Sequence, residues 1–77
     1  MGSSLRRQFG IRLKAIRLER KLTQEQFAEL VGISVDFLSL IERGINAPSF
    51  EVLERMGKSL GLQIRELFDF RRPAIGK

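Results

Sequence analysis

The side chains that could do chemistry in this chain of 77 residues are acids, bases and amides, because it contains neither histidine nor cysteine. A Cys/His metal site and a disulfide are therefore excluded, and a metal held only by carboxylates is not expected. Glu25, Glu29 and Glu42 are expected on helix surfaces or in ion pairs rather than in a shared cleft, and no glycine-rich phosphate loop is present. We therefore predict neither catalysis nor a cofactor.

Positive charge is the more informative feature. Fourteen Lys and Arg against nine Asp and Glu give a net charge of +5, and the pI is near 10.8. Such a balance favours an anionic partner, nucleic acid or membrane surface. Residues 1–21 carry seven bases and one acid. Five of these bases share one stripe of a helical wheel: Arg6, Arg7, Lys14, Arg17 and Lys21.

Apolar residues recur at helical spacing almost throughout, and no stretch shows sustained alternation, so the elements that position these charges should all be helices. The pattern predicts helices over residues 5–20, 24–31, 35–43, 50–60 and 64–70. The first four follow the capping residues Ser4, Thr23, Ser34 and Ser49. The predicted fold class is an all-α, compact five-helix bundle, with a domain over residues 1–70 and a tail over 71–77.

Each helix should bury one apolar face. The expected inward residues are Leu5, Phe9, Leu13 and Ile16 in the first helix, Phe50, Leu53, Met56 and Leu60 in the fourth, and Ile64, Leu67 and Phe68 in the fifth. Gly10 should mark a close helix contact, because glycine inside a helix is otherwise unfavourable. A second apolar stripe of the first helix, Ile11, Ala15 and Leu18, has no obvious burial.

The most informative segment runs from Gln24 to Arg43, where a short glycine-containing turn joins two short helices. So tight a turn makes the helices cross at a large angle, as in a helix-turn-helix. Ala28 is small enough to let the later helix approach, and Gly32 can adopt a positive φ without strain. The other positions that must point inward are all apolar: Phe27, Val31, Ile33, Leu38 and Ile41.

With its flanks, this segment resembles the Cro/phage-repressor (XRE-like) helix-turn-helix family over residues 5–69. The matching landmarks are Phe9-Gly10, Leu13, Ile16-Arg17, Leu22-Thr23-Gln24-Glu25, Phe27-Ala28, Gly32-Ile33-Ser34, Leu38-Ser39, Ile41-Glu42-Arg43-Gly44, Pro48-Ser49 and Leu53. The resemblance implies a lambda-repressor-like domain whose third helix enters the DNA major groove while the second lies across the backbone. It also implies a homodimer that binds double-stranded DNA at an inverted repeat.

The same resemblance implies roles for individual residues. The expected phosphate contacts are Gln24, Arg43, Asn46, Lys14 and Arg17. Arg17 is also expected to form an ion pair with Glu42 that ties the first helix to the third. Gln24 would act through its amide at a helix N-terminus, where backbone N–H groups and the helix dipole favour anions.

The expected base contacts are Val35, Asp36, Phe37, Ser39 and Leu40. They depart from the Gln, Lys, Arg, Ser or Asn that the family often places there. Asp36 can accept a hydrogen bond from the cytosine N4 amino group, and Val35 can pack on thymine methyls. Alternatively, Phe37 and Leu40 are partly packed within the domain, which leaves the other three to read bases.

These observations predict a cytoplasmic transcription regulator, a repressor or autoregulator, of the phage-repressor, restriction–modification controller or antitoxin type. No apolar stretch suits a signal peptide or a membrane span, and no membrane partner is expected. The alternative is a protein-interaction module without operator binding, which the acidic and apolar third helix favours. Two surfaces are candidates for protein contact: Ile11 with Leu18, and Phe70 with Ile75.

Overall fold

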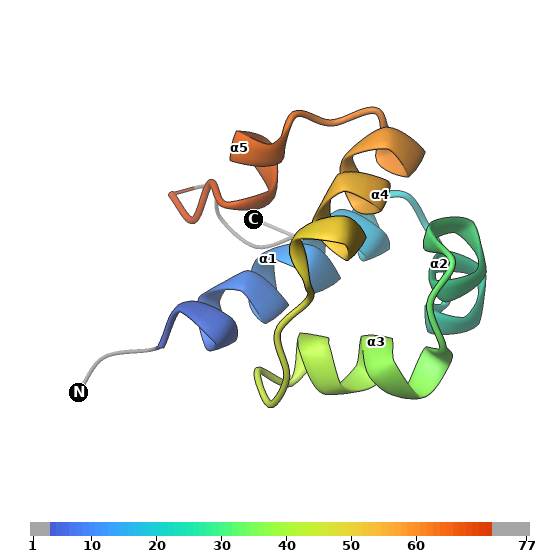
Figure 1. Ribbon diagram of the computed structural model, residues 1–77, viewed down its shortest axis with the longest axis horizontal. Helices are drawn as coiled ribbons and strands as arrows, with labels where there is room; N and C mark the ends of the chain where they lie inside the picture. Colours follow the sequence, from blue (N-terminus) through green and yellow to red (C-terminus); the bar gives the residue numbers. More distant parts are fainter. Residues whose placement is uncertain (1–3, 72–77) are drawn as a thin grey trace.

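The computed structural model describes residues 4–71, and all regular elements within that range are helices. The helices are α1 (Leu5–Glu19), α2 (Gln24–Val31), α3 (Val35–Glu42), α4 (Phe50–Leu60) and α5 (Ile64–Leu67). Figure 1 shows α1 passing behind α4, with α2 and α3 joined at one side of the bundle and α5 at the other. The predicted all-helical bundle is confirmed.

Local hydrogen bonds explain where the first four helices begin. Ser4, Thr23, Ser34 and Ser49 each accept a bond from the backbone N–H three residues later. At Thr23 the bond is reciprocated, because its backbone N–H donates to the Gln26 side chain at 2.9 Å. Each such cap stabilises a helix by about 1 kcal/mol, so these boundaries follow from the sequence alone.

One apolar core holds together all of the first four helices, α1, α2, α3 and α4, and the end of α5. Its fully buried side chains include Leu13, Phe27, Leu38, Ile41 and Met56. Deleting such a side chain removes its burial and leaves a cavity, so the fold depends on these contacts across four helices.

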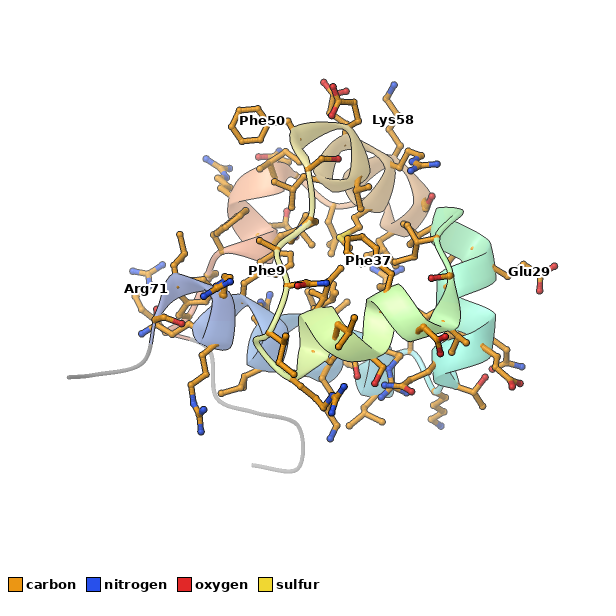
Figure 2. All side chains as sticks on the ribbon, turned by 60° about the horizontal axis from the view of Figure 1, so that its bottom comes forward. Phe9, Glu29, Phe37, Phe50, Lys58 and Arg71 are labelled. Atoms are coloured by element: carbon orange, nitrogen blue, oxygen red, sulfur yellow. The ribbon has the colours of Figure 1, made fainter. Side chains whose placement is uncertain are left out.

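Three residues expected in the core lie at the surface instead. Leu5 is 60% exposed, Phe50 82% and Ile64 43%, and Figure 2 shows Phe50 directed away from the bundle. All three open their helices, and a first turn can extend past the elements that cover the rest of the face. Leu5 and Phe50 border an apolar pocket of about 180 Å³ rather than filling it.

Two further expectations, for α1 and for α5, are corrected by the structure. Arg12 donates from Nε to the backbone oxygen of Glu66 at 3.0 Å, so α5 covers this side of α1. Ala15, which was expected to lack burial, is buried. The fifth helix ends at Leu67 instead of residue 70. The half-buried Phe68 packs on Phe9, with the two ring centroids 5.0 Å apart and the rings tilted by 36°.

Two further expectations concern the ends of the chain and the membrane. Within residues 4–71 no helix is long and apolar enough to cross a bilayer. Apart from Arg71, the predicted tail lies outside the described residues, and so does Ile75.

Candidate nucleic-acid interface

The turn between α2 and α3 is built as the sequence predicted. Gly32 caps α2 with a φ of +86°, and its N–H donates to the oxygen of Ala28 at 2.8 Å. Ile33 packs half-buried against the core, and Ser34 then opens α3. Glycine adopts this positive φ without the strain that a Cβ would bring. The helix-turn-helix is therefore formed by α2 and α3.

Helix α4 holds the turn in place through two side chains that the sequence analysis did not single out. Arg55 donates from Nη1 to the oxygen of Gly32 at 3.3 Å, and Ser59 donates to the oxygen of Leu30 at 3.2 Å. Arg55 and Ser59 are four residues apart, so they share one face of α4. Their acceptors are backbone carbonyls, which leave no mark in a sequence.

The exposed face of α3 carries only part of the expected base-contact set. Asp36 is exposed and Val35 is 36% exposed, while Ser39 and Leu40 are half-buried. Phe37 is half-buried against the core, and Figure 2 places it on the side of α3 toward the body of the molecule. For Phe37, this placement favours the alternative in which it packs within the domain.

The loop after α3 is held against the start of α1. Arg6 donates from Nη1 to the oxygen of Ile45 at 3.1 Å. Gly44 has a φ of +79°, and a Cβ there would lie 2.9 Å from the Cα of Arg7. Arg43 is exposed and Asn46 half-buried on this segment. Residues from the basic end of α1 are thus brought beside the end of α3.

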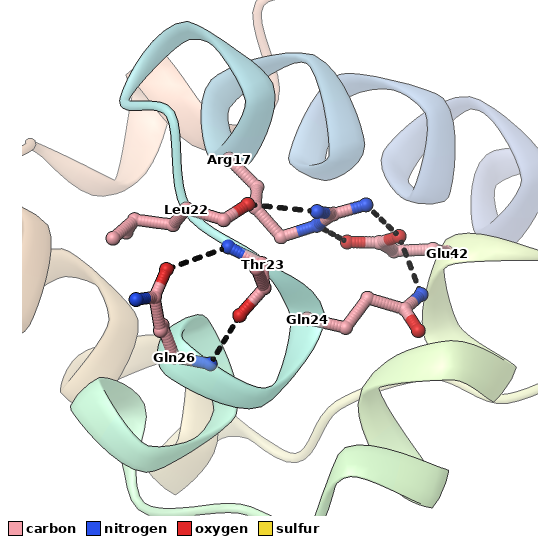
Figure 3. A network of polar contacts seen from close by, with 6 residues as sticks. All are labelled: Arg17, Leu22, Thr23, Gln24, Gln26 and Glu42. Atoms are coloured by element: carbon pink, nitrogen blue, oxygen red, sulfur yellow. Dashed lines mark hydrogen bonds and ion pairs between the residues drawn. The ribbon is translucent and has the colours of Figure 1, made fainter.

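A buried polar network lies where α1, α2 and α3 meet (Figure 3). Arg17 donates from Nε to Glu42 Oε2 at 2.7 Å and from Nη2 to Oε1 at 3.1 Å, and its Nη1 donates to the oxygen of Leu22 at 2.9 Å. The Arg17 and Glu42 side chains are only 8% and 3% exposed. Gln24 donates from Nε2 to Glu42 Oε1 at 3.0 Å. The expected ion pair is present, and it has a third member.

This placement corrects one of the two roles given to Arg17. Its guanidinium is buried and bonded to Glu42 and to the backbone of Leu22, so it is not available to a phosphate. The exposed basic residues of α1 are instead Arg6, Arg7 and Lys14, and the exposed Arg20 and Lys21 follow the helix. Long-range attraction of an anion falls to these side chains.

Residues 13–67 match the family described as helix-turn-helix. This chain belongs to the helix-turn-helix family. This helix-turn-helix protein is 34% identical over 71 residues to control protein C.BamHI of Bacillus amyloliquefaciens, a match covering 91% of this chain and 88% of that one. It is 49% identical over 55 residues to the immunity repressor protein of Bacillus phage phi105, over 71% of this chain.

The match spans only 38% of that phage repressor's length. Among solved structures, the restriction–modification controller protein C.AhdI of Aeromonas hydrophila superposes with a TM-score of 0.77 at 32% identity, over 82% of this chain and 96% of the other. These relatives are named as a repressor, a control protein and a restriction–modification controller. The chain is a DNA-binding transcription regulator of this family.

Proposed function

We propose that this regulator binds an inverted-repeat DNA operator as a homodimer, with α3 in the major groove and α2 across the backbone, and acts as a repressor or autoregulator. The observation that supports this docking most directly is the exposed first turn of α3, at Val35 and Asp36. Polar groups lie at the other end of α3, where Gln24 is bonded to Glu42 and Arg43 follows the helix.

Affinity in this proposal comes mainly from phosphate contacts. The proposed contacts are Gln24, Arg43, Asn46 and Lys14. Arg43 and Lys14 are exposed charges, and each phosphate that such a charge neutralises adds about 0.9 to the salt slope of binding. The regulator is proposed to act in the cytoplasm through residues 1–70, with neither catalysis nor a cofactor.

The proposed base contacts are Val35, Asp36 and Ser39, with Leu40 at the edge of the set. The half-buried Phe37 contributes to shape rather than to base recognition.

Changing Asp36→Ala is expected to abolish a preference for one C·G pair, because a carboxylate accepts from cytosine N4 and alanine cannot. The selected consensus should lose about tenfold discrimination at one position, within the range for a good side-chain–base contact.

Glu29→Ala is the matched control for this prediction. Glu29 is an exposed acid on α2, so its loss changes the net charge equally without altering α3. Duplex selection with each variant separates a general gain in affinity from a change in preference. An unchanged consensus for Asp36→Ala would show that Asp36 does not read a base.

Two surfaces were expected to pair with protein. Ile11 is 54% exposed and Leu18 45%, and their spacing of seven residues places them on one side of α1. Phe70 is half-buried, with its ring 6.0 Å from that of Phe68, so it offers less apolar area. We therefore keep Ile11 and Leu18 as the proposed protein-contact surface of this regulator.

Selection of binding sites from random duplexes tests the function. We expect an inverted repeat with half-sites about 10 bp apart, or a multiple of that, because a two-fold dimer presents two copies of α3 one helical turn apart. With about six phosphate contacts, affinity should fall roughly a thousandfold between 50 and 200 mM salt. The competing function is a protein-interaction module. It is favoured by the acidic and apolar character of residues 35–43, whose one basic residue is Arg43. A selection in which no duplex is enriched would support this protein-interaction module.

A further inference from the structure

The side chain of Glu42 does more than neutralise Arg17. We propose that Glu42 is a positioning residue for DNA binding, which fixes the carboxamide of Gln24 so that one N–H of its Nε2 is directed to a backbone phosphate. The inference rests on the proposed function, because it assigns the control of one phosphate contact within that interface.

The orientation of the Gln24 amide follows from the chemistry of its partner. An ionised carboxylate only accepts hydrogen bonds, so the group facing Glu42 must be the amide nitrogen and not the amide oxygen. The Nε2–Oε1 distance is 3.0 Å. Turning the amide over would place two acceptors against each other. Glu42 thereby selects one of the two amide orientations.

Glu42 can impose that choice because it is itself held rigidly. Both of its oxygens accept from Arg17, at 2.7 and 3.1 Å, and its side chain is 3% exposed. Arg17 is in turn fixed to the backbone of Leu22, next to the start of α2. Among the described residues, no buried side-chain nitrogen or oxygen lacks a hydrogen-bond partner. The carboxylate therefore has a defined position from which to orient Gln24.

The remaining hydrogen-bond donor of the Gln24 amide suits an anion. An amide nitrogen carries two hydrogens, and one is used by Glu42. A phosphate oxygen only accepts, so the second hydrogen is the part of the group that can bind it. Gln24 is half-buried as the first residue of α2, where the free backbone N–H groups also favour an anion. An amide already oriented loses less rotamer entropy on binding than a free one.

A double-mutant cycle separates positioning from simple structural support. Arg17→Met with Glu42→Met removes the buried pair without changing net charge, and apolar replacement of a buried pair is often tolerated. In the natural background, Gln24→Ala should weaken operator binding about tenfold per subunit, the low end for a hydrogen bond to a charged acceptor. In the double-methionine background it should weaken binding less than twofold. The salt slope should stay unchanged, because the amide carries no charge.

Gln63→Ala is the control, since Gln63 is an exposed glutamine whose side chain makes no capping bond at α5. It should not affect affinity in either background. An equal loss from Gln24→Ala in both backgrounds overturns the inference, and so does no loss in the natural one. In either case the operator is still bound, whereas failure of the proposed function would leave no duplex bound at all.

A measurement on the unchanged protein covers the case in which the double variant does not fold. The two Nε2 protons of Gln24 give separate NMR signals. In the free protein one should already be shifted by the carboxylate of Glu42, and only the other should move when operator DNA is added. Movement of both protons, or of neither, contradicts the inference.

Discussion

Glu42→Ala is expected to lower the free energy of unfolding by about 3–5 kcal/mol, the typical cost of leaving one member of a buried ion pair without its partner. The Arg17 side chain is 8% exposed, and its guanidinium would keep only the bond to the oxygen of Leu22. Domains have roughly 0.05–0.15 kcal/mol of stability per residue, so this loss removes much of the total for a chain of 77 residues. Urea unfolding followed by circular dichroism measures it, since the chain has neither Trp nor Tyr.

Two companion variants give this result its meaning. Glu54→Ala removes an exposed acid of α4, and should change stability by no more than about 0.5 kcal/mol. Arg17→Met combined with Glu42→Met should recover most of the loss, because no unpaired charge stays buried. A Glu42→Ala protein within 1 kcal/mol of the parent would mean that the pair is solvated and does not hold α1 to α3.

Local chemistry explains why so much of the fold could be predicted. A capping oxygen acts within three residues, so Ser34 fixes the start of α3 whatever surrounds it. The turn is similarly local, because Gly32 supplies the one conformation that ends α2 and redirects the chain. Apolar spacing then selects the inward faces, and Leu38 and Ile41 are fully buried as expected.

The errors arise where the answer depends on what lies opposite a residue. A helical wheel places Phe50 in line with Leu53, but it cannot show that Phe50 is left uncovered while Leu53 is buried. The reverse holds for Ala15, which is buried although the sequence pattern indicated nothing that would cover it. Spacing within a helix defines a face, while burial is decided by another part of the chain.

At the interface too, part of the arrangement could be predicted, while the part that depends on how the helices cross could not. The Arg17–Glu42 pair could be expected from the resemblance, but giving Arg17 a phosphate as well overlooked that burial excludes the second role. The bond from Gln24 to Glu42 spans 18 residues and joins two polar side chains that were assigned separately. Nothing in the sequence relates them, because their approach depends on the crossing of α2 and α3.

The contact of α1 with α3 should also be the point at which the fold is most sensitive to one methyl group. Gly10 lies where a Cβ would be 2.3 Å from the backbone oxygen of Ile41 and 2.7 Å from that of Glu42. Backbone atoms in a packed core cannot move aside as a side chain does, and overpacking typically costs 1–3 kcal/mol. We expect Gly10→Ala to cost about 3 kcal/mol, although alanine alone favours a helix by about 1 kcal/mol.

Gly57→Ala on α4 is the matched control for that prediction, because both substitutions gain the same helix propensity. A Cβ at Gly57 would lie 3.0 Å from the oxygen of Leu62, a much milder overlap, so this variant should stay within about 1 kcal/mol of the parent. Thermal unfolding of both variants gives the comparison.

Separating the helices to admit the methyl group would also lengthen the 2.7 Å bond between Arg17 and Glu42. Gly10→Ala should therefore weaken operator binding along with stability, and equal stability of the two variants would refute the close approach of α1 to α3.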